Sequence, residues 1–325
     1  MNVNTQHLPA DAPAIAAAAQ IIREGGLVAF PTETVYGLGA DATSGRAVVG
    51  IYAAKGRPRF NPLIAHVTDL TAARLQGDFS ADAEKLAQAF WPGPLTLVVP
   101  KAAGCTVSDI ATAGLDSVAL RVPAHPVARA LLAAVDRPVA APSANVSGHV
   151  SATTAAHVAA DLDGRIDAIV DGGATDVGVE STILACLDGM VTMLRPGGVS
   201  REAIEAVLGH GLEEAMVSNA EEPLAPGMLA SHYAPKARVR LNADRVFSGE
   251  AWLGFGDARP AGLEQASHQA TLSATGDLAE AAANLFGLLR SLDRADVVAI
   301  AVAPIPSEGL GEAIQDRLAR AAAER

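Results

Sequence analysis

Three cations lie within five residues of one another, Lys55, Arg57 and Arg59, and two further polar side chains, Asn61 and His66, follow them closely. Guanidinium groups bind phosphate and carboxylate oxygens through paired hydrogen bonds, so such a cluster is typical of an anion-binding site. A purely structural alternative exists, because these cations follow a predicted helix and a glycine stands where a C-cap belongs. The density of donors favours the anion site.

A second polar cluster, residues 31–39, reads Pro-Thr-Glu-Thr-Val-Tyr-Gly-Leu-Gly and directly follows the apolar run at residues 27–30. The apolar run predicts a buried strand, and the cluster after it predicts a loop. Loops at strand ends are where small-molecule sites are usually built. The two threonines, the carboxylate and the tyrosine therefore indicate a ligand site at this strand end.

A third group follows the predicted strand at residues 138–141, where Pro-Ser-Ala-Asn occupies residues 142–145 and Ser151 comes shortly after. Small hydroxyls and an amide at a strand end suit the phosphates or ribose of a nucleotide. A local alternative is equally open, in which Ser143 and Asn145 form a turn and Ser151 is the N-cap of the next helix.

Two arginines add to this set. Arg121 lies inside an otherwise apolar strand, so it needs a buried partner, either a ligand carboxylate or Asp116. Arg195 precedes Pro-Gly-Gly and is compatible with an ordinary turn as well as with a site, as is the Glu-Ser-Thr run at residues 180–182. Neither stretch is specific by itself.

The sequence lacks the motifs of several common kinds of catalytic site. The sequence has no Gly-x-Ser-x-Gly, Walker-type loop or paired Cys and His, and residues 37–39 lack the third glycine of a dinucleotide fingerprint. The histidines at 66, 125, 149 and 157 show no metal-ligand spacing and are typical of surface or loop positions. The two cysteines are not spaced as CxxC, which disfavours a zinc knuckle or a disulfide framework and suggests a reducing cytoplasm.

Composition and charge disfavour two further classes of protein, those that wrap nucleic acid and those that span a membrane. The formal net charge of −12 is shared by both halves of the chain and argues against a protein whose bulk wraps nucleic acid, so any contact with tRNA would need a local basic patch. No apolar run approaches the roughly 20 residues that span a bilayer, and no signal-peptide pattern is expected at the N-terminus. A membrane role is therefore not predicted.

The hydrophobic pattern alternates between short and long periods. Helices are predicted at 12–23, 44–54, 81–90, 125–135, 153–162 and 201–208, and strands at 27–30, 63–67, 95–99, 117–122, 138–141, 168–170, 181–184 and 191–194. Strands alternate with helices in places and follow one another in others. This order predicts a mixed sheet with helices packed on it.

A linker is predicted at residues 211–236, because proline, glycine and acidic residues interrupt the pattern there. A second α/β unit follows at 237–325, with strands at 239–241, 251–255 and 297–302 and helices at 277–292 and 309–323. Its length suits a small doubly wound domain.

Taken in order, these motifs resemble the YrdC-domain family, in particular its long, two-domain threonylcarbamoyl-AMP synthases. The resemblance rests on Pro-Thr-Glu-Thr-x-Tyr-Gly-Leu at 31–38, the Lys-x-Arg and Ser-x-Asn pairs at 55/57 and 143/145, and Ser-His-Tyr-Ala-Pro at 231–235. It implies a YrdC-like mixed twisted sheet with flanking helices at 10–210, a lid over the site at 211–236, and a small Rossmann-like α/β domain at 237–325.

The resemblance also implies roles for individual residues. Threonine would be held by Thr34, His66, Arg121, Ala141 and Ser181. ATP would be held by Arg57, Asn61, Ser117, Ser143, Asn145, Ser151 and Arg195. Lys55 and Arg57 would serve catalysis beside the phosphates, and Ser231, His232 and Tyr233 would belong to the lid.

The implied reaction joins L-threonine, bicarbonate and ATP, with Mg²⁺, into threonylcarbamoyl-adenylate and pyrophosphate, for transfer to adenosine in tRNA. Such a displacement depends on positioning and charge stabilisation more than on a nucleophile, which agrees with the residues present. Two alternatives are open. One is a non-catalytic RNA-binding protein of the same fold. The other is a carbamoyl-phosphate enzyme, whose greater length and zinc motifs this chain lacks.

Overall fold

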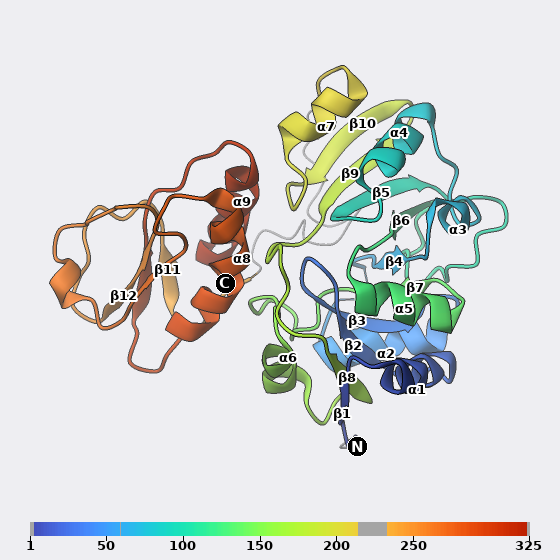
Figure 1. Cartoon of the computed structure of the whole chain (residues 1–325), viewed down its shortest axis with the longest axis horizontal. Coiled ribbons are helices and arrows are strands. Elements are labelled where there is room, and N and C mark those ends of the chain that lie inside the picture. The colour runs from blue at the N-terminus through green and yellow to red at the C-terminus, as the bar shows by residue number, and fades with distance from the viewer. Residues whose placement is uncertain (1–2, 59, 214–232, 324–325) are drawn as a thin grey trace.

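The computed structural model of the chain describes residues 3–58, 60–213 and 233–323. Two sheets organise these residues: a ten-stranded mixed sheet and a smaller, four-stranded parallel sheet (Figure 1). The predicted fold class, a mixed sheet with flanking helices and a second, smaller α/β unit, is confirmed. Within the described ranges, no helix is long and apolar enough to cross a membrane.

The large sheet has the order β1-β8-β2-β3-β7-β4-β6-β5-β9-β10. Its strands are β1 (Gln6–Pro9), β2 (Val28–Pro31), β3 (Tyr36–Asp41), β4 (Ile64–His66), β5 (Leu95–Pro100), β6 (Ser117–Arg121), β7 (Val139–Ala140), β8 (Ala168–Asp171), β9 (Thr182–Leu187) and β10 (Met190–Arg195). Its helices are α1 (Ala12–Arg23), α2 (Gly45–Lys55), α3 (Leu70–Arg74), α4 (Ala81–Phe90), α5 (Pro126–Val135), α6 (Ala155–Leu162) and α7 (Arg201–Leu208).

Strand β2 shows why the sheet needs helices on both faces. Val28 and Phe30 belong to a core cluster shared with α1 and α5, whereas Ala29 between them belongs to the cluster that contains α2 and α6. Successive side chains of a strand point to opposite faces, so a strand covered on both faces is apolar throughout. The strand predicted at residues 27–30 is therefore present, shifted by one residue to Val28–Pro31.

The predicted loop at residues 31–39 is only partly a loop. Tyr36–Asp41 form strand β3, which pairs antiparallel with β2 and places Phe30 opposite Gly37. A Cβ at Gly39 would lie 2.7 Å from the Phe30 ring, so glycine allows the two strands to approach. The irregular part shrinks to residues 32–35. Strand β1, helix α3 and, in the smaller sheet, strand β13 (Gln269–Thr271) were not predicted either.

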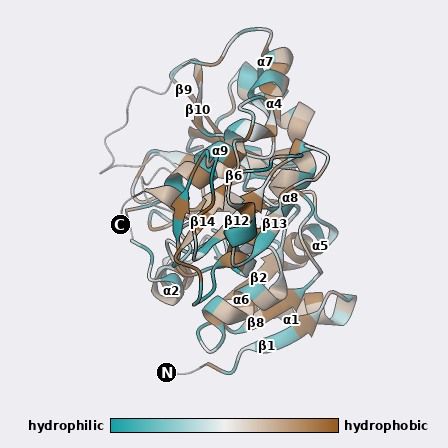
Figure 2. Ribbon diagram, turned by 90° about the vertical axis from the view of Figure 1, so that its left-hand side faces the viewer, coloured by the Kyte–Doolittle hydropathy of each residue, from teal (hydrophilic) through white to brown (hydrophobic). Residues whose placement is uncertain are grey.

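The small sheet has the order β11-β14-β12-β13, and its strands are all parallel. Its elements are β11 (Arg238–Arg240), β12 (Glu250–Gly254), the 3-10 turn η1 (Leu263–Gln265), β13 (Gln269–Thr271), α8 (Leu278–Leu292), β14 (Ala299–Val302) and α9 (Leu310–Ala322). Figure 2 views the chain from the side of this sheet.

The two helices of the small unit do not flank its sheet, as a doubly wound arrangement would require. Both α8 and α9 share one core cluster with Leu253 and Ile300, whereas Trp252 on the opposite face packs against Val246 and Leu263. Helices α8 and α9 therefore lie between the small sheet and the large unit (Figure 1). The predicted boundaries at 210 and 236 stay predictions, because residues 214–232 of the linker lie outside the described residues.

The two units contact each other through α8 and α9. Arg290 of α8 forms an ion pair with Asp161 at 3.0 Å, and Glu312 of α9 forms one with Arg201 at 2.6 Å. At Gly178, where φ is +75°, a Cβ would lie only 2.3 Å from a carbonyl oxygen of α8. A glycine at this position therefore lets the large unit lie against the helix backbone.

Candidate active site

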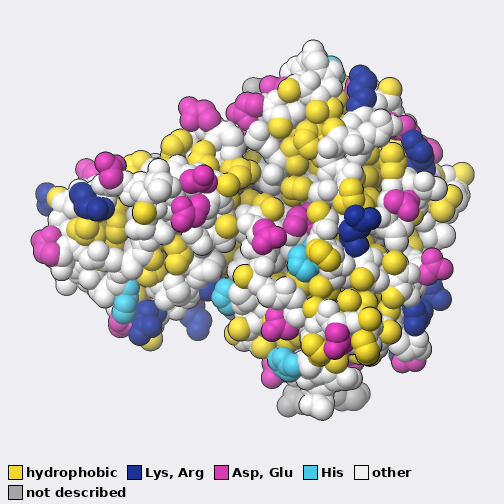
Figure 3. All heavy atoms as spheres, viewed as in Figure 1, with side chains coloured by type: hydrophobic (Ala, Val, Ile, Leu, Met, Phe, Trp, Pro, Cys, Tyr) yellow, Lys and Arg dark blue, Asp and Glu magenta, His cyan; other side chains and the backbone are white. Residues whose placement is uncertain are grey.

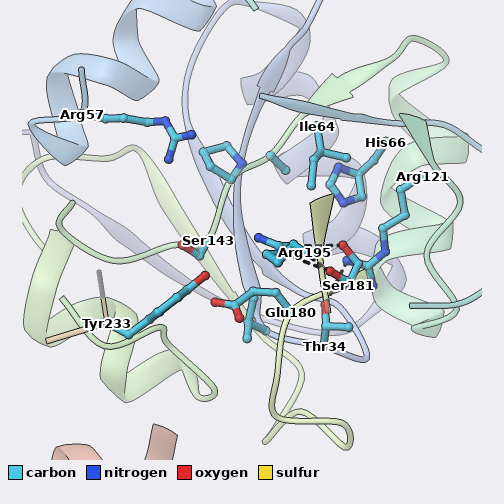
Figure 4. Close-up of a pocket in the computed structure, with 13 residues that line it drawn as sticks. Thr34, Arg57, Ile64, His66, Arg121, Ser143, Glu180, Ser181, Arg195 and Tyr233 are labelled. Atoms are coloured by element: carbon cyan, nitrogen blue, oxygen red, sulfur yellow. Dashed lines mark hydrogen bonds between the residues drawn. The ribbon is translucent and has the colours of Figure 1, made fainter. Parts of the chain in front are cut away.

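A cavity opens among strand ends of the large sheet and encloses about 460 Å³, counting the solvent at its mouth. Figure 4 shows the side chains that point into it. The lining residues are Thr34, Val35, Arg57, Ile64, His66, Arg121, Ala141, Pro142, Ser143, Glu180, Ser181, Arg195 and Tyr233.

Strand register places the first pair of site residues side by side. His66 ends β4 and Arg121 ends β6, and the two are direct partners in the parallel pairing of these strands. Residues opposite each other on neighbouring strands point to the same face of a sheet. The predicted threonine-binding residues His66 and Arg121 are therefore brought together by the fold.

The buried partner of Arg121 is Glu33 and not Asp116. The Nη2 of Arg121 donates to Glu33 Oε1 at 2.6 Å, and Nη1 donates to Thr34 Oγ1 at 2.9 Å. The other carboxylate oxygen of Glu33 accepts from the backbone N–H of Ala124. Burial by itself would raise the pKa of Glu33, but the charge of Arg121 and these hydrogen bonds hold it below the ordinary value.

His66 is a buried residue, so its interpretation as a surface histidine was wrong. Its exposed fraction is 2%, and its Nδ1 has no hydrogen-bond partner among the residues that the structure describes. Burial and the nearby charge of Arg121 lower the pKa of His66 to about 3, so the ring is neutral at physiological pH. A neutral ring has one donor and one acceptor nitrogen, and the unpartnered Nδ1 can bind a ligand.

Arg57 agrees with both interpretations of its motif, the end of a helix and an anion-binding site. Helix α2 ends in Gly56, which adopts the left-handed conformation of a C-cap, and Arg57 then turns into the cavity. Its Nη2 donates to the carbonyl of Pro62 at 3.1 Å, and no carboxylate within the described ranges forms an ion pair with it. Burial lowers the pKa of Arg57 to about 10, so the guanidinium keeps its charge at neutral pH.

Lys55 lies behind the wall of the cavity. Its Nζ donates to the carbonyls of Ser143 and Asn145, both at 2.5 Å, and its exposed fraction is 1%. Burial drives the pKa of Lys55 well below its usual value. The amine therefore holds the loop at 143–145 in place, and its predicted catalytic role stays a prediction.

Ser181 and Arg195 form another wall. A shift in the β9–β10 register between Met193 and Arg195 marks the end of β10, where Arg195 enters the cavity. Its Nη2 donates to the carbonyl of Ser181 at 2.8 Å. A Cβ at Gly197 would lie 2.4 Å from the Ser181 backbone, so the Pro-Gly-Gly turn serves this close approach.

Two carboxylates of the site, Glu33 and Glu180, lie within the sequence motifs, but neither was assigned a partner or a substrate from the sequence. Glu33 pairs with Arg121, as described above. Glu180 lines the cavity, accepts from Ser151 Oγ at 2.5 Å and pairs with Arg317 of α9 at 2.8 Å. Long-range partners of this kind leave no local pattern in a sequence.

Four predicted ATP-binding residues do not line the cavity. Asn61 and Asn145 are buried nearby, and the Oδ1 of each has no partner in the described part of the chain. Ser151 is buried and donates to Glu180, and the N-cap of α6 is Thr154, so the N-cap interpretation of Ser151 was wrong. Ser117 begins β6, at the opposite end from Arg121, roughly 13 Å away by strand geometry.

The linker contributes one described residue to the cavity. Tyr233 is 1% exposed, with its ring stacked on Phe286 of α8 at 5.5 Å between centroids. Its φ of +61° is unusual for a residue other than glycine. Ser231 and His232, the other predicted lid residues, lie outside the described residues, as does Arg59.

Comparison with known proteins identifies the family to which the chain belongs. A family model described as "Telomere recombination", for Sua5, YciO and YrdC, matches residues 20–197. A second, described as "Threonylcarbamoyl-AMP synthase, C-terminal domain", matches residues 199–323. Threonylcarbamoyl-AMP synthase of Bacillus subtilis is 44% identical over 99% of this chain and 96% of its own length.

Two further relatives extend the comparison. Threonylcarbamoyl-AMP synthase of Pyrococcus abyssi is 43% identical over 95% of this chain and 94% of its own length. The crystal structure of P. abyssi Sua5 complexed with L-threonine has a TM-score of 0.88, with 39% identity, and covers 98% of this chain and 97% of that one. The chain therefore belongs to the Sua5–YciO–YrdC family and has the C-terminal domain of the threonylcarbamoyl-AMP synthases.

Proposed function

We propose that the protein is a nucleotidyltransferase that makes threonylcarbamoyl-AMP from L-threonine, bicarbonate and ATP. The observation that carries this proposal is Arg57, a buried cation without a carboxylate partner among the described residues, in the same cavity as the neutral His66 and the paired Arg121. An uncompensated buried charge is costly, and an anionic ligand relieves that cost. Names of the relatives support the choice of substrates.

Threonine fits the side of the cavity that holds Arg121. An arginine has five N–H donors, and Arg121 uses three of them on Gly93, Thr34 and Glu33. Two donors are therefore left for the carboxylate of threonine. Because Glu33 already balances the charge of Arg121, the bound carboxylate is recognised mainly through hydrogen-bond geometry.

ATP fits the side that holds Arg57, Ser143 and Arg195. These side chains line the same cavity as the threonine residues, so the phosphates come within reach of the amino acid. Lys55 and Asn145 support this side from behind. In this arrangement Arg57 and Arg195 place positive charge around the phosphates.

The reaction follows from these positions. The threonine amine and bicarbonate form a carbamate and release water. A carbamate oxygen then bonds to the α-phosphorus of ATP as the bond to the β-phosphate oxygen breaks, and pyrophosphate leaves. The chain supplies alignment and charge stabilisation, and the buried Tyr233 limits the access of water to the labile carbamate.

Mg²⁺ is proposed to enter with ATP. Within the described ranges, no group of three His, Cys, Asp or Glu side chains could hold a metal ion by itself. Mg²⁺ often keeps several waters and binds through substrate phosphates, which agrees with this donor set. The unpartnered Oδ1 of Asn145 is an oxygen beside the cavity that suits such an ion. When bound, Mg²⁺ neutralises charge on the phosphates.

The product is proposed to supply the threonylcarbamoyl group for adenosine in tRNA, in the cytoplasm. On the face shown in Figure 3, basic and acidic side chains are interspersed and no continuous basic patch is visible. A non-catalytic RNA-binding role therefore gains no support from that face. The relatives are named as synthases, which favours an enzyme over a non-catalytic RNA-binding protein.

Pyrophosphate release tests the proposal. The protein is incubated with ATP and Mg²⁺, and L-threonine and bicarbonate are added singly and together. Release is expected only when both are present, with threonylcarbamoyl-AMP detected by mass spectrometry. Release that does not depend on threonine, or none with the full mixture, would refute the assigned reaction.

A further inference from the structure

Arg317 of helix α9 is the largest fully buried side chain of the described residues, and it lies where the small unit meets the cavity. It does not line the cavity itself. Its guanidinium carbon lies 5.3 Å from the centre of the Tyr233 ring. Such a cation over an aromatic face is favourable and becomes stronger when water is excluded.

The hydrogen bonds of Arg317 lead to residues directly beside two predicted substrate contacts. Its Nε donates to Glu180 Oε2 at 2.8 Å, and its Nη1 donates to the carbonyl of Pro196 at 2.9 Å. Glu180 precedes Ser181 in the chain, and Pro196 follows Arg195. One planar guanidinium thus fixes both strands of the wall that Ser181 and Arg195 form.

The same network reaches a third predicted contact. The second oxygen of Glu180 accepts from Ser151 Oγ at 2.5 Å. Burial by itself would raise the pKa of Glu180, but the charges of Arg317 and Arg195 hold it below the ordinary value. Glu180 is therefore ionised and joins α9 to the ATP side of the cavity.

We propose that Arg317 is a positioning residue for catalysis, through which the small unit orients Ser181, Arg195 and Tyr233. The kinetic test of this role rests on the proposed function, because it measures the synthesis of threonylcarbamoyl-AMP. A buried ion pair is weak evidence for stability, since apolar residues of similar volume often replace one without loss. The role proposed for Arg317 is geometric, because its planar guanidinium holds Glu180 and the carbonyl of Pro196 in fixed directions.

A matched control is present on the same helix. Glu312 of α9 pairs with Arg201 of α7 at 2.6 Å, so this pair also joins the two units, but it is partly exposed and neither residue lines the cavity. Exposed pairs contribute little to stability. Arg201→Met is therefore expected to change the kinetic constants by no more than about twofold.

Kinetics of Arg317→Met separate positioning from mere folding. A smaller folded fraction lowers the apparent kcat and leaves KM unchanged. Loss of positioning raises KM for ATP more than KM for threonine, because Arg195 and Ser151 are assigned to ATP and only Ser181 to threonine. We expect kcat/KM for ATP to fall by about 10–100-fold, and Arg317→Lys to recover only part of the loss.

A double variant covers the case in which Arg317→Met folds poorly. Arg317→Met with Glu180→Gln removes both charges of this pair, and Asp316, the other carboxylate that contacts Arg317, keeps its ion pair with Arg320. This variant is expected to fold and still to show the raised KM for ATP. In the double-mutant cycle the losses should be strongly non-additive. Additive losses, or an unchanged KM for ATP in a folded Arg317 variant, would overturn the proposal.

Hydrogen exchange gives a readout that does not need the reaction. Without substrates, Arg317→Met should speed the exchange of backbone amides at residues 180–198 relative to both wild type and Arg201→Met. Failure of the wild type to release pyrophosphate would refute the proposed function and leave this comparison intact. Equal exchange in all three proteins would overturn the positioning role.

Discussion

Replacement of Arg57 by alanine should lower kcat/KM for ATP by about 30–1,000-fold, or about 2–4 kcal/mol of transition-state stabilisation. Arg57 uses Nε on the carbonyl of Asn61 and one Nη2 proton on that of Pro62. Three of its five donors are then left for phosphate oxygens. A hydrogen bond to a charged group contributes about 1.5–3 kcal/mol, so the expected loss corresponds to between one and two such bonds of a forked contact.

Arg57→Lys should recover only part of this loss, because a point charge replaces a planar fork. The assay is pyrophosphate release at saturating threonine and bicarbonate with ATP varied. Arg74→Ala provides a control, since Arg74 is an exposed arginine in a surface ion pair with Glu84. Thermal unfolding checks the folded state, where loss of the two carbonyl contacts costs about 1 kcal/mol each. Near-wild-type kcat/KM in a folded Arg57→Ala protein would refute the assignment of Arg57 to ATP.

Three further predictions concern stability, specificity and the second unit. Glu33→Gln should destabilise the protein by about 3–5 kcal/mol in urea unfolding, because it leaves Arg121 without its buried counter-charge. The pKa of Glu33 in the folded protein lies below its ordinary value of 4.5. The ion pair therefore stabilises the fold above pH 4.5, and this stabilisation is lost as the pH falls through the folded-state pKa. The free energy of unfolding between pH 5 and 3 should thus depend less on pH in the variant, and equal pH dependence would contradict this. Threonine amide should compete poorly with threonine in calorimetry because it lacks the carboxylate that Arg121 binds, whereas serine should bind only about 1–3 kcal/mol more weakly; equal binding of the amide would give Arg121 another role. Truncation after Leu208 should leave a protein that is folded by circular dichroism, because the large sheet is complete before that residue. Its activity should be lower, because Tyr233 is removed and water can reach the carbamate. Full activity of the truncated protein would rule out the lid.

The elements of the fold were predictable where the hydrophobic period was unbroken. Helix α1 and helix α7 begin and end at the predicted residues, because Asp11 and Ser200 are side-chain N-caps that mark their starts. Strand β3 was missed because its glycines and polar neighbours are typical of a loop, whereas Gly39 in fact allows close packing on Phe30. Pairing between strands decided the structure there, and single-sequence patterns do not contain it.

The candidate site was predictable as a set of residues but not as a network. Thr34, Arg57, His66 and Arg121 all line one cavity, as the motifs suggested. The counter-charges were not foreseen, since Glu33 lies 88 residues from Arg121 and Arg317 lies 137 residues from Glu180. Electrostatic partners that distant meet only in the folded chain, so their pairing follows from the topology.

The strand order has a consequence for synthesis on the ribosome. Strand β8 (residues 168–171) lies between β1 and β2 in the sheet, so both N-terminal strands lack this neighbour until residue 171 has emerged. At roughly 5–20 residues per second, the ribosome takes about 7–28 s to add the residues between β2 and the end of β8. During this interval an apolar strand edge of β2 is unpaired, which is a hazard for aggregation. Such non-local pairing also slows refolding, so the full-length chain should refold more slowly than a helical protein of its size.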